Sequence, residues 1–140
     1  DIDKIMENYR FVPRTDEEVR FVERLTKEAV IKATERHAGR IRYVYGPSGR
    51  STLAEGKDLS QVKYIIGTGG ALTRLPNRRE ILEAIALHNE TGLLLFPGTE
   101  AETLIDNDYI MASLGVLSKR YKDAAVCFLE QSLCCSLRQE

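Results

Sequence analysis

Residues 65–76 read Ile-Ile-Gly-Thr-Gly-Gly-Ala-Leu-Thr-Arg-Leu-Pro, and this stretch decides the fold class of the chain. An apolar run over residues 62–66 leads into the glycines, and an amphipathic segment that starts near Asn77 follows them. This order predicts a strand, a tight turn and a helix. Gly67, Gly69 and Gly70 permit positive φ angles and remove side chains that would keep a flat ligand off the backbone. Phosphate or nucleotide groups bind at such turns, although many glycine turns serve packing alone.

The glycine turn matches neither of two well-known nucleotide fingerprints. A dinucleotide-binding turn needs a third glycine three residues further on, and this chain has none there. A P-loop needs a Gly-Lys-Ser or Gly-Lys-Thr sequence, which does not follow either.

The segments before the turn predict a long helix and a strand. Thr15 or Asp16 caps the helix, which ends before Gly39. Its apolar face consists of Val19, Val22, Leu25, Ala29, Val30 and Ala33. Residues 40–45 alternate charged with apolar or aromatic residues and predict a strand. Residues 48–57 are polar and predict a mobile loop.

The segments after the turn complete an α/β pattern. Asn77 and Glu80 resemble a capping box at the start of a helix that Gly92 ends. Residues 93–96 predict a buried strand, Asn107 or Asp108 caps a helix to about residue 121, and a last helix runs through Phe128. We therefore expect residues 1–140 to form a single α/β domain with a mostly parallel sheet covered by helices. Ligands of such sheets bind at the carboxyl ends of strands, where the glycine turn would lie.

The composition is typical of a soluble globular protein, with 43% hydrophobic and 29% charged residues. A net charge of −1 argues against nucleic acid as a partner, because nucleic-acid binders carry a basic excess. No apolar run approaches the length that crosses a bilayer, and no signal peptide is visible. Three cysteines are expected to be reduced thiols, so we expect a cytoplasmic protein.

Residues 69–76 resemble the adenosine motif of the actin, heat-shock chaperone and sugar-kinase superfamily, with one residue inserted before Thr73. A closer resemblance, to the L protein of glutamate mutase (the MutL or GlmL family), covers nearly the whole chain. Five motifs carry it: Arg36-His37-Ala38-Gly39, Glu55-Gly56-Lys57-Asp58-Leu59, Ile66-Gly67-Thr68-Gly69-Gly70, Ile105-Asp106-Asn107-Asp108-Tyr109-Ile110-Met111-Ala112 and Gly115-Val116-Leu117-Ser118.

This resemblance implies part of an actin-like ATPase (ribonuclease H-like) lobe that binds ATP or ADP, with Mg²⁺ in the full-length protein. It implies a role in maintaining or reactivating a cobalamin-dependent mutase, which would be the partner. No Asp-x-Gly phosphate turn is present, so we expect a C-terminal fragment whose N-terminal lobe is missing and which has no ATPase activity alone. Apolar surface left bare by that lobe would favour a homodimer.

The expected nucleotide-binding residues are Gly67, Thr68, Gly69, Gly70 and Arg74. Arg74 would stack its guanidinium on adenine, unless it is only an exposed arginine at a helix start. Thr68 would contact the ligand or satisfy its own turn. Lys57 and Asp58 could reach a ribose or a neighbouring lobe, and Asp58 could equally cap the short turn at Leu59.

No catalytic residue and no metal ligand can be assigned from the sequence. Asp106 and Asp108 precede a helix and are interpreted mainly as a capping cluster. His88 has no partner ligand at helical spacing. Two other functions stay open: a small-molecule kinase of the same fold, and a non-catalytic protein-interaction module.

Overall fold

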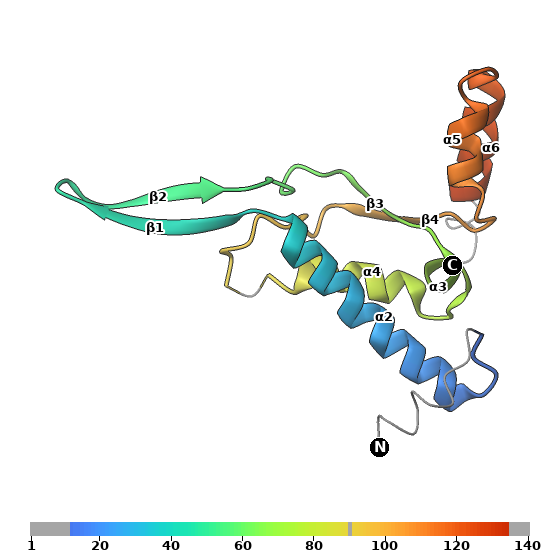
Figure 1. Ribbon diagram of the computed structural model, residues 1–140, viewed down its shortest axis with the longest axis horizontal. Helices are drawn as coiled ribbons and strands as arrows, with labels where there is room; N and C mark the ends of the chain where they lie inside the picture. Colours follow the sequence, from blue (N-terminus) through green and yellow to red (C-terminus); the bar gives the residue numbers. More distant parts are fainter. Residues whose placement is uncertain (1–11, 90, 135–140) are drawn as a thin grey trace.

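A computed structural model describes residues 12–89 and 91–134, and the elements are arranged around one parallel strand pair (Figure 1). The helices are α2 (Asp16–His37), α3 (Gly70–Arg74), α4 (Arg78–Leu87), α5 (Met111–Leu117) and α6 (Lys122–Cys134). The strands are β1 (Arg40–Gly46), β2 (Gly49–Glu55), β3 (Tyr64–Gly67) and β4 (Glu102–Ile105). The expected α/β class is confirmed in this mixed order of helices and strands.

The strands form two small sheets and not the single, mostly parallel sheet that we expected. In the described part of the chain, β3 pairs with β4 in parallel and β1 pairs with β2 in an antiparallel hairpin. Residues 48–57 are therefore mainly strand β2, and the prediction of a mobile loop is wrong. The polar residues of β2 are compatible with a strand because both faces of this hairpin are exposed.

Further predictions differ from the structure in the second half of the chain. Helix α4 ends at Leu87, before the predicted end at Gly92. Residues 93–96 form no regular strand; Leu94 makes one isolated bridge to Arg40, and neighbouring amides and carbonyls bond to Gly39, Ile41 and Leu59. The parallel partner of β3 is instead β4, which the sequence reading missed. The helix that follows begins at Met111 and ends at Leu117, earlier than the predicted end near residue 121.

Helix α2 matches its prediction, including the capping residue. The Glu18 amide donates to Thr15 Oγ1 (3.2 Å) and the Thr15 amide donates to the Glu18 carboxylate (3.2 Å), which forms a capping box. After the helix, Gly39 lies against Gly56, and a Cβ on Gly39 would stand 2.5 Å from the Glu55 carbonyl oxygen. Gly39 thus lets two backbone segments cross closely. The motifs at residues 36–39 and 55–59 meet at this crossing.

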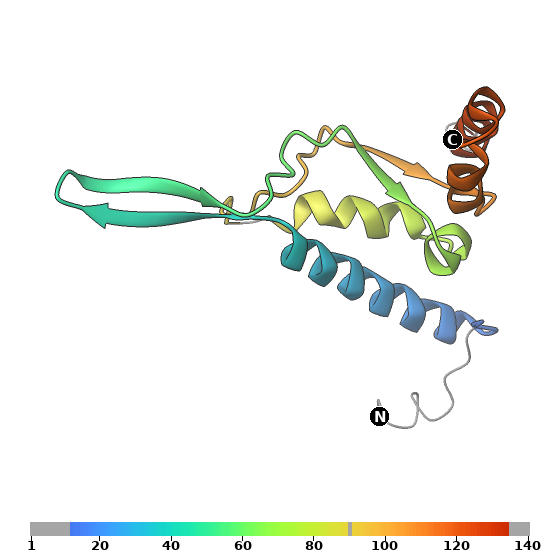
Figure 2. The same cartoon turned by 45° about the horizontal axis from the view of Figure 1, so that its top comes forward.

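The core lies between α4 and the parallel strand pair. Leu82 and Ile85 of α4 pack with Phe96 and with Ile105 of β4, and each of the four is buried. Helix α2 packs on α4, while α5 and α6 form a helical hairpin at one end of the molecule. The β1–β2 hairpin extends from the opposite end, as both views show (Figures 1 and 2).

Candidate functional site

The glycine turn, residues 67–70, follows the carboxyl end of β3, as the sequence predicted. Gly69 has φ = 91°, a left-handed conformation that L side chains rarely adopt, and it precedes the first residue of α3. Its carbonyl accepts hydrogen bonds from both the amide (3.0 Å) and the hydroxyl (3.0 Å) of Thr73. Because Thr73 is buried, the turn is held firmly at the start of α3.

The other two glycines of the turn have different roles. A Cβ on Gly67 would stand 2.6 Å from Leu82 Cδ1 and 3.2 Å from Ile105 Cδ1, so this glycine allows α4 and β4 to approach β3. A Cβ on Gly70 would meet nothing within 4 Å. Gly67 is therefore a packing glycine, whereas Gly70 presents open backbone.

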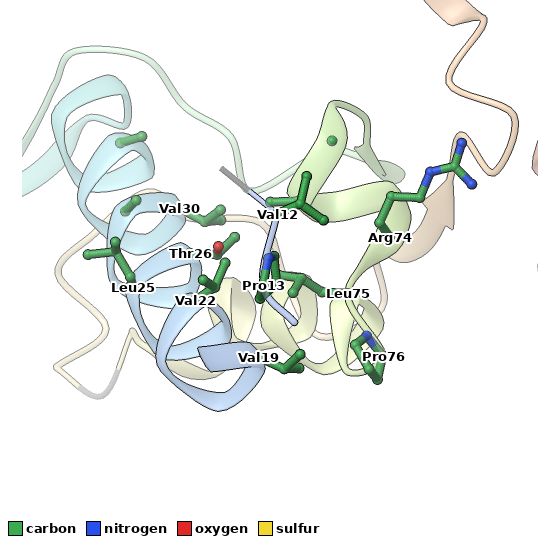
Figure 3. A pocket seen from close by; sticks show the side chains of 14 residues that line it. Val12, Pro13, Val19, Val22, Leu25, Thr26, Val30, Arg74, Leu75 and Pro76 are labelled. Atoms are coloured by element: carbon green, nitrogen blue, oxygen red, sulfur yellow. The ribbon is translucent and has the colours of Figure 1, made fainter. Parts of the chain in front are cut away.

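Gly70 borders a groove of about 930 Å³ between α2 and α3 (Figure 3). A volume of this size falls within the range of small-molecule sites. The α2 wall is the apolar face that the sequence predicted, Val19, Val22, Leu25, Ala29, Val30 and Ala33, together with Thr26. The opposite wall consists of Gly70, Ala71, Arg74, Leu75 and Pro76, and the remaining lining residues are Val12 and Pro13. The apolar face of α2 thus lines a groove and is not fully buried.

Arg74 stands at the edge of this groove. Its side chain is exposed and extends away from α2 (Figure 3). Among residues 12–89 and 91–134, its guanidinium has no hydrogen bond or ion pair. The predicted stacking of Arg74 on adenine is untested, and a bound ring would have to lie on the outer side of the groove, or the side chain would have to turn inward.

Thr68 does not face the groove. Its hydroxyl donates to Asp106 Oδ2 (2.9 Å), which lies just after β4. Through this hydroxyl Thr68 therefore does not satisfy its own turn, while contact of Thr68 with a ligand stays a prediction. It ties the turn after one strand to the segment after the neighbouring strand.

Asp106 is a buried centre of four hydrogen bonds, with no exposed surface. Besides Thr68, its carboxylate accepts from the amides of Ile110 (3.1 Å) and Met111 (3.0 Å) and from the hydroxyl of Ser132 (3.2 Å). The prediction that Asn107 or Asp108 caps the next helix is wrong, because the N-cap of α5 is Ile110, without a side-chain cap. Asp106, a member of the predicted capping cluster, instead binds the amides of that N-cap residue and of the first residue of α5. The sequence reading missed Ser132, since one serine in an apolar helix carries no recognisable signal.

The charge on Asp106 is stabilised by these donors. Burial raises the pKa of Asp106. Hydrogen bonds from Met111, Ile110, Thr68 and Ser132 lower the pKa by more than burial raises it, so the pKa lies below its ordinary value. A carboxylate with both oxygens already occupied is not arranged to accept a proton from a substrate or to coordinate a metal ion. Asp106 is therefore structural.

The other polar residues singled out in the sequence also have structural partners. Asp58 Oδ1 accepts from the Ser60 amide (2.9 Å), which confirms Asp58 as a capping residue. Lys57 Nζ lies 3.5 Å from His37 Nε2, away from the groove-lining residues. His88 bonds to Glu35 (2.9 Å) and stacks on Phe96. Asn77 lacks the expected cap and instead donates from its amide (2.9 Å) and its side chain (3.1 Å) to Glu23.

Three further observations concern the described residues as a set. No three His, Cys, Asp or Glu side chains among them are grouped closely enough to hold a metal ion. None of the helices in this part of the chain is both long and apolar enough to cross a membrane. Cys127 is exposed with a free thiol, while Cys135 lies outside the described residues.

Comparison with known proteins gives one family and one relative. The family model described as "MutL protein" matches residues 1–133. "Protein MutL" of Clostridium tetanomorphum is 39% identical over 127 residues, which cover 91% of this chain and 27% of that protein. The chain thus spans about a quarter of the length of this curated relative. No solved structure matches the chain.

Proposed function

The chain belongs to the MutL protein family, and from this premise we propose that it forms the adenine-nucleotide-binding lobe of an actin-like ATPase. The mutase that this ATPase would maintain or reactivate is a cobalamin-dependent enzyme of the glutamate mutase type. The chain matches about a quarter of its relative, so the complete catalytic site would need residues from the longer protein.

The observation that carries the nucleotide proposal is the groove beside Gly70. It lies at the carboxyl end of a parallel strand, where α/β proteins bind ligands. Its wall is apolar, as an adenine ring requires, and one side is open backbone at Gly70. The single charged side chain among its lining residues is Arg74, which can stack on an aromatic ring if it turns inward or if the ring lies on the outer side of the groove.

The described residues fit the adenosine half of a nucleotide better than the phosphate half. The carboxylate beside the glycine turn, Asp106, is buried and fully hydrogen-bonded, so it is not free to hold Mg²⁺. Mg²⁺ would neutralise phosphate charge in the complete protein, with ligands from outside this chain. The role of residues 70–74 would be to bind and orient the base.

Titration of ADP into the full-length protein tests this proposal. Arg74→Ala should weaken ADP binding by a few-fold to about tenfold, because a cation–π contact is worth about 0.5–2 kcal/mol. Arg24→Ala is a matched control, since Arg24 is an exposed arginine of α2 that does not line the groove. Equal affinities for Arg74→Ala and wild type would remove the stacking assignment. Failure of the wild type to bind ADP would remove the nucleotide proposal itself.

Gly70→Val provides a second test of the same groove. A branched side chain would fill the space beside the open backbone, so it should weaken ADP binding more than it lowers the free energy of unfolding. Unchanged ADP affinity with a large loss of stability would show that the turn serves folding only. Association with the mutase is tested separately, by co-purification of the two full-length proteins.

A further inference from the structure

Two adjacent glycines, Gly69 and Gly70, give the glycine turn more intrinsic backbone freedom than its neighbours have. Glycine loses more conformational entropy than any other residue when one conformation is fixed. A ligand that needs the open backbone at Gly70 would bind weakly to a loose turn, because binding would have to order that turn. Contacts that fix the turn before a ligand arrives therefore influence the affinity of the groove.

Hydrogen bonds hold the turn on both sides of these two glycines. On the C-terminal side, the buried Thr73 hydroxyl lies within hydrogen-bond distance of the carbonyls of both glycines (3.0 and 3.3 Å). On the N-terminal side, the Asp106 amide donates to the Gly67 carbonyl (2.9 Å), and the Thr68 hydroxyl donates to Asp106 Oδ2 (2.9 Å). Thr68 is thus the side chain that holds the N-terminal half of the turn.

Asp106 is a fixed anchor for Thr68. It has no exposed surface, and its carboxylate also accepts from the amides of Ile110 and Met111 and from the hydroxyl of Ser132. These three donors belong to the start of α5 and to α6, whereas Thr68 belongs to the glycine turn. Thr68 itself is an exposed residue, so the orientation of its side chain depends on this hydrogen bond more than on packing.

We infer that Thr68 is a positioning residue of the groove: bonded to Asp106, it fixes the glycine turn in the conformation that presents the Gly70 backbone to the ligand. The inference rests on the proposed function, in which this ligand is an adenine nucleotide. Neither Thr68 nor Asp106 is among the residues that line the groove. Loss of the Thr68 hydroxyl therefore leaves the groove walls in place and removes a bond that orders the turn before binding.

Titration of ADP into full-length variants tests the inference. Thr68→Val keeps the shape of the side chain without the donor, and it should raise the dissociation constant for ADP about three- to tenfold, because binding would have to order the turn. Thr68→Ser keeps the hydroxyl donor and should bind ADP within about twofold of the wild type. Ser132→Ala is the matched control. It removes another hydroxyl donor from the same carboxylate, but Ser132 does not line the groove, so the ADP affinity should change less than about twofold.

Hydrogen exchange of the ligand-free proteins separates positioning from direct contact with the ligand. The amides of Thr73 and Asp106 report on the turn, because they donate to its carbonyls at Gly69 and Gly67. Both amides should exchange faster in Thr68→Val than in the wild type, since the turn would open more often. Thr68→Ser and Ser132→Ala should exchange at nearly the wild-type rate. A hydroxyl that only contacts the ligand would leave exchange in the free protein unchanged.

Each outcome decides the inference. Weaker ADP binding and faster exchange in Thr68→Val, with nearly wild-type values in Thr68→Ser and Ser132→Ala, support it. Wild-type ADP affinity in Thr68→Val overturns it and leaves the proposed function standing. Weaker binding with unchanged exchange also overturns it, since the hydroxyl would then act on the ligand directly. Equal weakening in Ser132→Ala or in Thr68→Ser overturns the role of the Thr68 hydroxyl. If the wild type does not bind ADP, the proposed function fails and this inference fails with it.

Discussion

Asp106 joins three parts of the molecule through one carboxylate. Its oxygens accept from Thr68 after β3, from the first amides of α5 and from Ser132 in α6. A buried acceptor of this kind is costly to replace. Each buried donor that loses the carboxylate would have no partner in the folded protein, although it bonds to water in the unfolded chain. Asp106, which the sequence shows only as one member of an acidic cluster, thus holds these three parts of the structure together.

Asp106→Asn should lower the free energy of unfolding by about 1–3 kcal/mol, since the amide nitrogen would face donors in place of an acceptor. Chemical denaturation of the two proteins measures this. Asp108→Asn is the control, because Asp108 is exposed. Equal stability losses in the two variants would contradict the role of Asp106.

The same carboxylate predicts a pH dependence. The pKa of Asp106 is lower in the folded protein than its ordinary value of 3.8, so the ionised form stabilises the fold above that pH. This stabilisation should decrease as the pH falls from about 3.8 through the folded-state pKa. The stability difference between wild type and Asp106→Asn should therefore narrow in acid. A difference that stays constant from pH 7 to pH 2 would show that the charge is unimportant.

Gly67 and Gly70 form a second matched pair of substitutions. Gly67→Ala places a methyl group against Leu82 and Ile105, so it should lower stability by about 1–3 kcal/mol through overpacking. Gly70→Ala meets open space and should leave stability nearly unchanged. Thermal unfolding compares the two. A larger loss in Gly70→Ala would reverse the roles assigned to these glycines.

Some single residues were predictable from the sequence because their partner is local, although Asn77 bonds to the distant Glu23 and not to its own helix. Thr15 as a helix cap and Asp58 as a turn cap follow from neighbours three or two positions away. The roles of Thr68 and Ser132 depend on Asp106, which is 38 and 26 residues distant. The family resemblance predicted that the glycine turn binds a nucleotide. The different roles of Gly67 and Gly70 become visible only in the structure, from the atoms that a Cβ at each position would meet.

At the scale of elements, the start of α2 offers a direct test. Thr15→Ala removes the acceptor of the Glu18 amide and should lower the free energy of unfolding by about 1 kcal/mol. Glu17→Ala in the same first turn removes only a favourable charge at the helix start and should cost less than about 0.5 kcal/mol. Equal losses measured by chemical denaturation would show that the capping box contributes nothing specific.

Elements with strong periodicity were predicted, and elements defined by pairing were not. Helix α2 and strand β1 have local signatures in charge, apolar spacing and turn residues. Strand β2 is polar and is a strand only because β1 supplies its hydrogen bonds. Residues 93–96 are more apolar than β4, but their hydrogen bonds go to Gly39, Ile41 and Leu59, so no regular pairing forms there.

At the scale of the whole molecule, residues 1–140 alone should not hydrolyse ATP above the background rate. Phosphoryl transfer needs Mg²⁺-bound phosphates held in line with a water, and the acid beside the glycine turn is already occupied by hydrogen bonds. A phosphate-release assay on the highly purified chain measures this, with full-length protein alongside. Turnover by the isolated chain that disappears in Gly70→Val would contradict the proposed division of the site.

The number of residues between the two strands of each pair influences the order in which the pairs can form. A short tip joins β1 to β2, so the two strands can pair transiently within microseconds, although a lone two-stranded hairpin is only marginally stable. Tyr64 and Glu102 must wait until the intervening segment, with α4, has closed a much longer loop. The hairpin therefore acquires its shape by a route independent of the glycine turn. Substitutions on its exposed faces should leave the refolding rate of the body unaltered.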